Sequence, residues 1–410
     1  MIRRGDGALA APFLAVLLMA LVEFGQAWFY PGGSGGGVEV ARPGGGAFRM
    51  ALWLAAVAVI ATHLARRGAV PMARALWPFA PFLVWGAAVA LLWSVDRTTS
   101  LRTLVFWALA AGLAVAAGDT VPPPRLARAV ALLFGAVIGG SLVLAVVLPD
   151  AAHTVYGVEL MVRGLFPHKN QFGWYAAIGL AWTWTLRAEL APRLVRLLLP
   201  LLGLGLLVAG SGTAIVVTAA AAGYLLGLQL AQHLFPDGAR AALAFAVATL
   251  AAAFVTALLA PLILDALGRD PTLTGRTDVW RHYLATVEGR PLTGFGPGTF
   301  STKSALNVAV GGTVPGYERE ALHSPHSLYI GLFGETGILG LAAFLVAQLH
   351  LAYVAPFRAV SPWLRLCGVL AFAILVAGIA EMRDGYAPGV ATVALLAARA
   401  TALRQPRSPN

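Results

Sequence analysis

The sequence is divided into long apolar runs that are separated by short polar breaks. A helix needs about 20 mainly apolar residues to cross the hydrocarbon core of a membrane. We place twelve such runs, at residues 8–24, 48–65, 76–93, 101–117, 126–148, 171–187, 194–210, 213–234, 240–265, 326–353, 363–382 and 388–404. The pattern predicts an all-α membrane protein with about twelve transmembrane helices.

The composition agrees with a membrane protein and excludes a nucleic-acid-binding one. Of the 410 residues, 59% are hydrophobic and only 11% are charged, which is not a soluble composition. The net charge of +11 comes from 27 Arg and two Lys, but these cations are scattered between the apolar runs. Because no basic domain is present to hold a duplex, we expect membrane lipids and no nucleic acid as partners.

The cations of the loops predict how the chain is oriented in the membrane. Sixteen Lys and Arg residues fall on one side, and thirteen on the other; eight of those thirteen lie in residues 149–170 and 266–325. The remaining loops of that side hold only five, so the positive-inside rule puts both termini in the cytoplasm. The boundary at residues 210–213 is the weakest, because a different division there would reverse the side of every later loop.

Segment 266–325 is too long for a simple connector. Apolar residues in 273–288 are spaced as in a helix, and Gly289 and Pro291 end it. We therefore expect three parts in the chain. They are nine helices with the outer segment 149–170 in residues 1–265, a large helical outer loop in 266–325, and three further helices in 326–410.

Three motifs lie in or beside the outer segments, and together they resemble a known family. The most informative one has His326 and Ser327, then nine residues, Gly337, two residues and Gly340. The others are Arg163-Gly-Leu-Phe-Pro-His-Lys-Asn-Gln171 and Gly275-Arg-Thr-Asp-Val-Trp280, which leads to Pro291-Leu-Thr-Gly-Phe-Gly296. Their order and spacing, and the many spans, resemble the O-antigen ligase family. That family includes protein O-oligosaccharyltransferases and is related to O-antigen polymerases.

The resemblance implies a glycosyltransferase of the GT-C class in a bacterial inner membrane. Its donor would be O-antigen polysaccharide on undecaprenyl diphosphate, and its acceptor the lipid A-core oligosaccharide on the periplasmic face. The resemblance also implies transfer without a metal or another cofactor. Direct attack by the acceptor hydroxyl would invert the configuration of the transferred sugar.

The outer cations suit a diphosphate leaving group. Negative charge grows on the phosphates as the sugar leaves, and fixed cations stabilise that charge. The planar guanidinium of arginine matches phosphate oxygens and stays charged at any relevant pH. The candidates in motif-like surroundings are Arg163, Lys169, Arg276 and Arg319.

His326 is the candidate general base. An imidazole titrates near neutral pH, and removing the acceptor's proton is usually worth ~10²–10⁴ in rate. Supporting positions are His323, His168, Asn170, Asp278 and Arg281.

Each assignment has a structural alternative. A histidine at the start of a helix can simply cap it, and His168 and Lys169 can anchor a helix at the membrane surface. Arg276 can pair with Asp278 or with another acid of its own loop, as solvated loop charges often do.

The acids of the chain predict neither a metal site nor a covalent nucleophile. Outer-loop acids supply oxygen ligands, but they form no compact motif, so we expect no metal. Glu23, Glu335 and Glu381 lie in or near the apolar runs, where charges are costly unless they are paired or reach water. We expect structural roles for all three.

Other functions share much of this pattern. An O-antigen polymerase would use a second lipid-linked glycan as acceptor, and a protein O-oligosaccharyltransferase would use a protein hydroxyl. A lipid-linked oligosaccharide flippase can also have twelve helices, but transporters often show repeats and broken helices at the membrane midplane, which the sequence does not suggest. A flippase would leave the glycan on its carrier.

Overall fold

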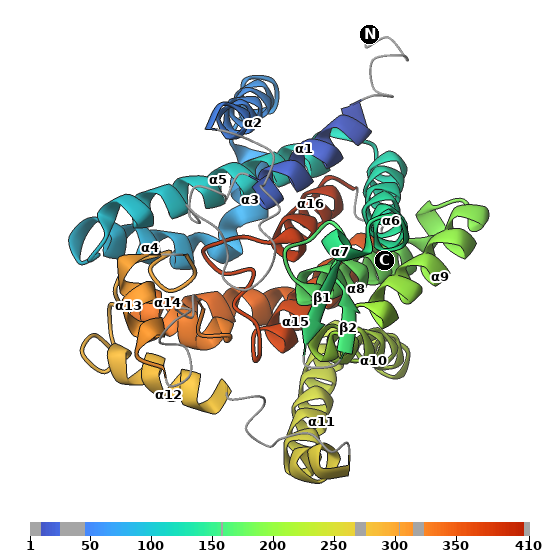
Figure 1. Ribbon diagram of the computed structural model, residues 1–410. Coiled ribbons are helices and arrows are strands. Elements are labelled where there is room, and N and C mark those ends of the chain that lie inside the picture. Colours follow the sequence, from blue (N-terminus) through green and yellow to red (C-terminus); the bar gives the residue numbers. More distant parts are fainter. Residues whose placement is uncertain are drawn as a thin grey trace.

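The computed structural model describes residues 10–24, 46–156, 159–266, 276–302, 304–314 and 324–405. Nearly all of this chain is helical (Figure 1). The helices are α1 (Ala10–Phe24), α2 (Gly46–Arg67), α3 (Val70–Leu76), α4 (Ala80–Leu92), α5 (Arg97–Thr120), α6 (Pro123–Val147), α7 (Pro149–Ala152), α8 (Lys169–Thr185), α9 (Pro192–Val208), α10 (Gly212–Leu234), α11 (Gly238–Ala266), α12 (Arg276–Val287), α13 (Ala305–Gly312), α14 (Leu328–Tyr353), α15 (Pro362–Ala377) and α16 (Val390–Arg404). Strands β1 (His153–Tyr156) and β2 (Glu159–Val162) form an antiparallel hairpin in the segment before α8.

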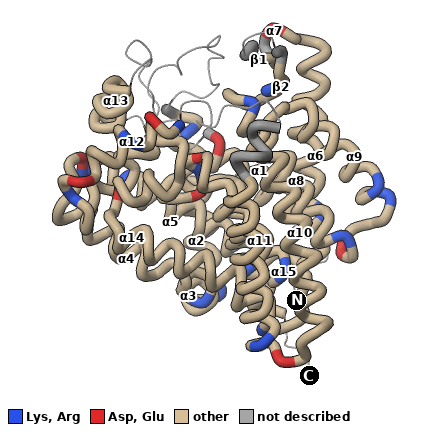
Figure 2. The backbone as a smooth tube through the Cα atoms, turned by 90° about the horizontal axis from the view of Figure 1, so that it is seen from below, with Lys and Arg blue, Asp and Glu red and all other residues tan. Residues whose placement is uncertain are grey.

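Each of the twelve predicted apolar runs contains a helix, and the predicted fold class is confirmed as an all-α membrane protein. Within the described residues, seven helical stretches are long and apolar enough to cross a membrane, and two shorter apolar helices accompany them. The seven stretches are Ala47–Arg67, Val70–Leu92, Arg97–Thr120, Pro123–Val147, Gly212–Leu234, Gly238–Thr256 and Leu328–Phe357. In Figure 2 most charged residues lie toward the ends of the helices, with long uncharged stretches between them.

The weakest predicted boundary coincides with a real break in the chain. Helix α9 ends at Val208, and α10 begins at Gly212. Gly210 has φ 55°, a conformation that side chains rarely adopt, and a Cβ there would lie 2.3 Å from Met161 Sδ of β2. Ser211 then caps α10, because its hydroxyl accepts a hydrogen bond from Ala214 N. The glycine and the cap together separate two helices that the apolar pattern nearly merges.

The centre of the bundle is built from helices α5, α8, α15 and α16, which are buried over most of their length. Small residues let these helices approach closely. A Cβ on Gly118 of α5 would lie 2.2 Å from the carbonyl oxygen of Ala397 on α16. Lipid acyl chains are as apolar as the surface of a helix, so apolar burial alone does not drive two membrane helices together. Close backbone contacts of this kind are what let helices associate in lipid.

Helices α12 and α13 form a separate cap beside α14 (Figure 1). The predicted apolar face of α12 is buried at Val279, Tyr283 and Val287. These side chains pack with Phe300 from the following loop and with Phe333 of α14. The cap therefore has its own small core, which rests against the helix that follows the His326 motif.

Candidate active site

The carboxylate of Glu381 joins three segments that are far apart in the sequence. It lies just after α15 and is 8% exposed. Its Oε1 accepts a hydrogen bond from Asn170 Nδ2 at 2.8 Å and lies 3.6 Å from Arg276 Nη2. Its Oε2 lies 3.6 Å from Arg383 Nε. One acid thus ties the start of α8 to the start of α12 and to the loop between α15 and α16.

His326 lies beside this cluster, in the turn that precedes α14. Its φ is 49°, which is unusual for a residue other than glycine and is maintained only where the surroundings fix it. The neighbouring bonds do so: His326 N donates to Ser324 Oγ at 3.1 Å, and Leu328 N donates to Gly378 O at 2.8 Å. The backbone of this turn is therefore held against the end of α15, close to Glu381.

The surroundings of His326 favour its neutral form. Burial lowers the pKa of His326 below the ordinary value of 6.5, and the positive charges of Arg276 and Arg383 lower it further. The negative charge of Glu381 opposes them and raises the pKa. At neutral pH the imidazole is therefore unprotonated, as a proton acceptor must be.

His168 is the N-cap of α8. Its Nδ1 accepts a hydrogen bond from Asn170 N at 3.1 Å, as a capping side chain does. Burial, and then the charge of Arg383, lowers the pKa of His168 to about 4, although Glu381 opposes this shift. Since Nδ1 accepts, the proton of the neutral ring is on Nε2. His168 is thus placed as a cap and as a hydrogen-bond donor.

Lys169 is the first residue of α8, and its Nζ lies 3.5 Å from Gly210 O. This contact brings the side chain to the turn between α9 and α10. Its positive charge also reaches His168 and contributes to the lowered pKa of that ring.

Arg163 follows β2 and is buried, with 7% of its surface exposed. Its backbone N donates to Ala152 O at 2.8 Å, which fixes the chain at this point. Its buried Nε has no hydrogen-bond partner, and among the described residues no acid forms an ion pair with its guanidinium. Among the described residues no hydrogen bond or ion pair joins Arg163 to Glu381, so Arg163 forms a second cationic position, in the segment 149–170 that also holds Lys169.

The remaining predicted positions lie elsewhere. Asp278 and Arg281 form an exposed ion pair with each other at 2.8 Å on α12, so Arg276 pairs with Glu381 rather than with Asp278. Arg319 and His323 lie outside the described residues. From the sequence we expected a structural role for Glu381, and Arg383 was not among the candidate residues.

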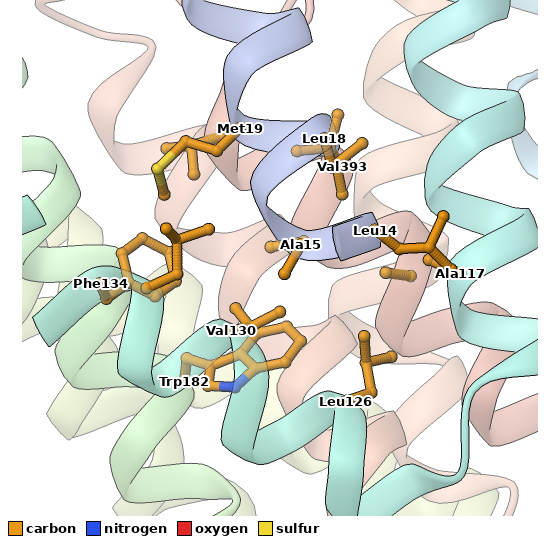
Figure 3. Close-up of a pocket in the computed structure, with 14 residues that line it drawn as sticks. Leu14, Ala15, Leu18, Met19, Ala117, Leu126, Val130, Phe134, Trp182 and Val393 are labelled. Carbon is orange, nitrogen blue, oxygen red and sulfur yellow. The ribbon is translucent and has the colours of Figure 1, made fainter. Parts of the chain in front are cut away.

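A metal site is absent from the described residues. They contain no group of three or more His, Cys, Asp or Glu side chains that could hold a metal ion. A cavity of about 30 Å³ lies between α1, α6, α8 and α16 (Figure 3). Leu14, Phe134, Trp182 and other apolar side chains line it, so it offers an apolar contact and no reactive group.

Comparisons with known proteins point to one family. The family model described as O-Antigen ligase matches residues 197–345, a range that includes the cap and His326. The chain is also 29% identical over 286 residues to the exopolysaccharide production protein ExoQ of Rhizobium meliloti (strain 1021). This alignment covers 65% of the chain and 62% of that relative's length. Both findings agree with the resemblance that the His326 motif carries.

Proposed function

We propose that this chain, which belongs to the O-antigen ligase family, transfers polysaccharide from undecaprenyl diphosphate to the lipid A-core oligosaccharide. The family supports the coarser statement that the protein is a membrane enzyme of the polysaccharide ligase or polymerase type. The observation that supports the proposed transfer chemistry, whichever the acceptor, is the position of His326. A partly buried imidazole with a lowered pKa lies beside two arginines and the carboxylate that pairs with both.

The proposed reaction is a direct displacement at the anomeric carbon of the donor glycan. The acceptor hydroxyl oxygen forms the new bond to that carbon, and its proton passes to the imidazole of His326. The bond between the carbon and the phosphate oxygen breaks, and the diphosphate leaves with the electron pair. This single displacement inverts the configuration and needs no metal.

Arg276 and Arg383 stabilise the charge that develops during this step. Both lie close enough to His326 to affect its pKa, so they are near the place where the acceptor loses its proton. Cations that are fixed before the reaction stabilise a leaving diphosphate without having to reorganise. Glu381 orients both arginines, and its negative charge stabilises the imidazolium that forms when His326 takes the proton.

Arg163 and Lys169 extend the anion site along the outer segment. A buried charge without a partner is costly, and among the described residues the Nε of Arg163 has no hydrogen-bond partner and its guanidinium no ion pair, which favours binding of an anion. Lys169 stands at the start of α8, where the helix dipole also favours negative charge. We assign both to the diphosphate, with Arg319 of segment 266–325 as a further candidate. His168 and Asn170 support the site by capping α8 and by bonding Glu381.

The distribution of charge supports a periplasmic site. The start of α8, the turn before α14 and the end of α15 all meet at Glu381, so these helix ends lie on one side of the bundle. The positive-inside rule assigns that side to the periplasm and both termini to the cytoplasm of the bacterial inner membrane. In this arrangement residues 1–265 and 326–410 form the GT-C-type membrane part, and residues 266–325 form the periplasmic loop.

The relative named for exopolysaccharide production favours a second candidate, an O-antigen or exopolysaccharide polymerase. A polymerase would use the same donor and the same base but would accept a hydroxyl of a second lipid-linked glycan. A protein O-oligosaccharyltransferase and a flippase are the remaining alternatives.

Reconstitution with defined substrates separates these functions. Purified protein in nanodiscs is incubated with undecaprenyl diphosphate-linked glycan, with or without lipid A-core and with or without EDTA. A ligase gives glycan-bearing lipid A-core and free undecaprenyl diphosphate, and EDTA leaves both unchanged. A polymerase lengthens the glycan on its carrier without lipid A-core, whereas a flippase releases no undecaprenyl diphosphate.

Two variants connect the activity to the site. Arg276→Gln removes a cation that pairs with Glu381, so it should strongly reduce transfer. Arg281→Gln removes an exposed cation on the same helix and serves as the matched control. Equal activity in both variants would remove Arg276 from the proposed mechanism.

A further inference from the structure

Helix α14 is broken shortly after the His326 motif. Thr336 has φ −136° and ψ 16°, and Gly337 has φ 66° and ψ −171°, so neither has helical geometry. The break divides the helix into an outer part, Leu328–Glu335, and the remainder down to Tyr353. His326 is attached to the outer part only. Whatever fixes that part therefore also fixes the position of the candidate base.

The loop that follows α12 fills this break. Phe295 N donates to Gly334 O at 2.8 Å, and Gly296 N donates to Glu335 O at 2.7 Å. On the other side of the break, Ile338 N donates to Pro291 O at 2.9 Å. Backbone groups that a regular helix would bond internally are bonded here by the loop, which satisfies them.

The side chain of Glu335 completes the junction. It is fully buried, and its Oε1 accepts hydrogen bonds from Phe300 N at 3.2 Å, Ser301 N at 2.8 Å and Ser301 Oγ at 2.6 Å. Its Oε2 is buried and has no hydrogen-bond partner among the described residues. A buried carboxyl group destabilises a protein unless it is hydrogen-bonded. The hydrogen bonds from these three donors offset that cost and allow Glu335 to stabilise the junction. The side chain of Glu335 therefore bonds the loop that follows α12.

The same loop is packed against the cap. The rings of Phe300 and Tyr283 of α12 meet edge to face, with their centroids 5.4 Å apart. Phe300 also lies against α14, since a Cβ on Gly334 would be 2.8 Å from its ring. Helix α12 begins at Arg276, which pairs with Glu381. A shift of α12 along α14 must therefore disturb the bonds that Glu335 makes.

We propose that Glu335 is a positioning residue that holds the α12 cap, and Arg276 with it, in register with His326. The proposal rests on the function proposed above, but its structural part does not depend on it. Glu335 does not touch the reacting atoms; it acts through the loop of residues 291–302. One carboxylate oxygen of Glu335 accepts hydrogen bonds from the loop. The loop in turn bonds the backbone at the break in α14 and packs against α12.

Hydrogen exchange tests the structural part of this proposal on the full chain in nanodiscs. Glu335→Ala removes the acceptor, so residues 294–302 and α12 should exchange faster while α5 and α16 keep their protection. Glu335→Gln retains an amide oxygen that can accept from Phe300 N and Ser301 N, so it should restore most of the protection. Ser301→Ala removes only the hydroxyl donor and should have an intermediate effect. Glu288→Gln, at an exposed acid after α12, is the matched control.

Kinetics test the positioning role. A misplacement of about 1 Å can cost ~10²-fold in rate, so Glu335→Ala should lower kcat by roughly that factor. We expect KM for the donor to change less than threefold, which would be about 0.7 kcal/mol, because Arg163 and Lys169 are outside the cap.

The pH profile separates a positioning role from a general loss of folded protein. Loss of folded protein would lower the rate at every pH without shifting the apparent pKa. The groups that set the charge environment of His326 are Glu381, Arg276 and Arg383, and His168 lies near the same acid. When α12 shifts away, the imidazole loses burial and the field of Arg276, so its pKa rises. The acidic limb of the rate profile in Glu335→Ala should therefore move to higher pH, and Glu335→Gln should return it.

Each outcome decides one part of the proposal. Unchanged hydrogen exchange of residues 294–302 in Glu335→Ala would overturn the proposal. Equal losses of kcat in the Ala and Gln variants, with no shift of the acidic limb of the rate profile, would also overturn it. If Glu335→Ala does not fold, Ser301→Ala against Glu288→Gln carries the same comparison. If wild-type protein transfers no glycan to any acceptor but the exchange result holds, the proposed function fails and the coupling of the cap to α14 stands.

Discussion

Asn170 and Glu381 are 211 residues apart in the chain, yet the amide of Asn170 donates a hydrogen bond of 2.8 Å to the carboxylate of Glu381. The same carboxylate oxygen lies 3.6 Å from Arg276, which begins the cap. The acid is therefore shared between α8 and the cap helix α12. Its loss should affect both the cations and the base of the proposed site.

Replacement of Glu381 tests this shared role. Glu381→Gln keeps an acceptor for Asn170 but removes the charge that pairs with Arg276 and Arg383. We expect transfer to fall by ~10²-fold, the usual cost of a misplaced catalytic group. Since Glu381 raises the pKa of His326, the acidic limb of the rate profile should move to lower pH. This direction is opposite to that expected for Glu335→Ala, and a shift to higher pH would contradict the assignment.

The pH dependence of the wild-type protein follows from the lowered pKa of His326. A base must be unprotonated, so activity is retained at pH 6.5 and is lost as the pH falls through the lowered pKa. His326→Ala should reduce transfer by ~10²–10⁴-fold and leave binding of undecaprenyl diphosphate in place. Initial rates between pH 4.5 and 8 and a separate binding assay provide the measurement. A midpoint above pH 7, or full activity in the Ala variant, would rule out His326 as the base.

The sequence predicted the helices well because apolar runs report burial in lipid directly. All twelve runs contain helices, and α12 buries Val279, Tyr283 and Val287 of its predicted apolar face, although Leu284 of that face is exposed. Of the candidates that the motifs suggested, Asn170 and Arg276 both contact Glu381, an acid whose charge reaches His326.

The sequence did not predict the role of Glu381 or the break in α14. An acid near the end of an apolar run has the same pattern whether it caps a helix or joins distant segments. The contact with Asn170 exists only because α8 and α15 pack side by side. Gly337 was noted as part of a motif, but its left-handed conformation depends on the loop after α12, which enters from outside the helix.

Arg163 should show opposite effects on stability and on donor binding. Its buried Nε has no hydrogen-bond partner among the described residues, so Arg163→Met removes a costly group from the protein without ligand. We expect the thermal midpoint in detergent to stay equal or rise, while KM for the lipid diphosphate rises by roughly tenfold, about 1.4 kcal/mol.

Arg399→Met is the contrast for this variant. Arg399 is also buried, but its Nε donates to Ala75 O at 2.9 Å, so its loss leaves a carbonyl without a partner. That variant should lower the thermal midpoint. If Arg163→Met is destabilised as much as Arg399→Met and binds the donor normally, Arg163 has a structural role instead.

Gly337 should be among the least replaceable residues of α14. Its φ of 66° is unfavourable for a side chain, and a Cβ would lie 2.1 Å from Leu292 O, a backbone atom that cannot turn away. Gly337→Ala must therefore displace the loop of residues 291–302, at a cost of about 1–3 kcal/mol for the backbone conformation alone. Gly223→Ala, in the interior of α10 with no atom within 4 Å of the new Cβ, should be neutral or slightly stabilising. Thermal unfolding of the two variants in the same detergent measures the difference. Equal thermal midpoints in the two variants would mean that the loop of residues 291–302 tolerates displacement. In that case the contact between this loop and the break in α14 could not set the position of His326.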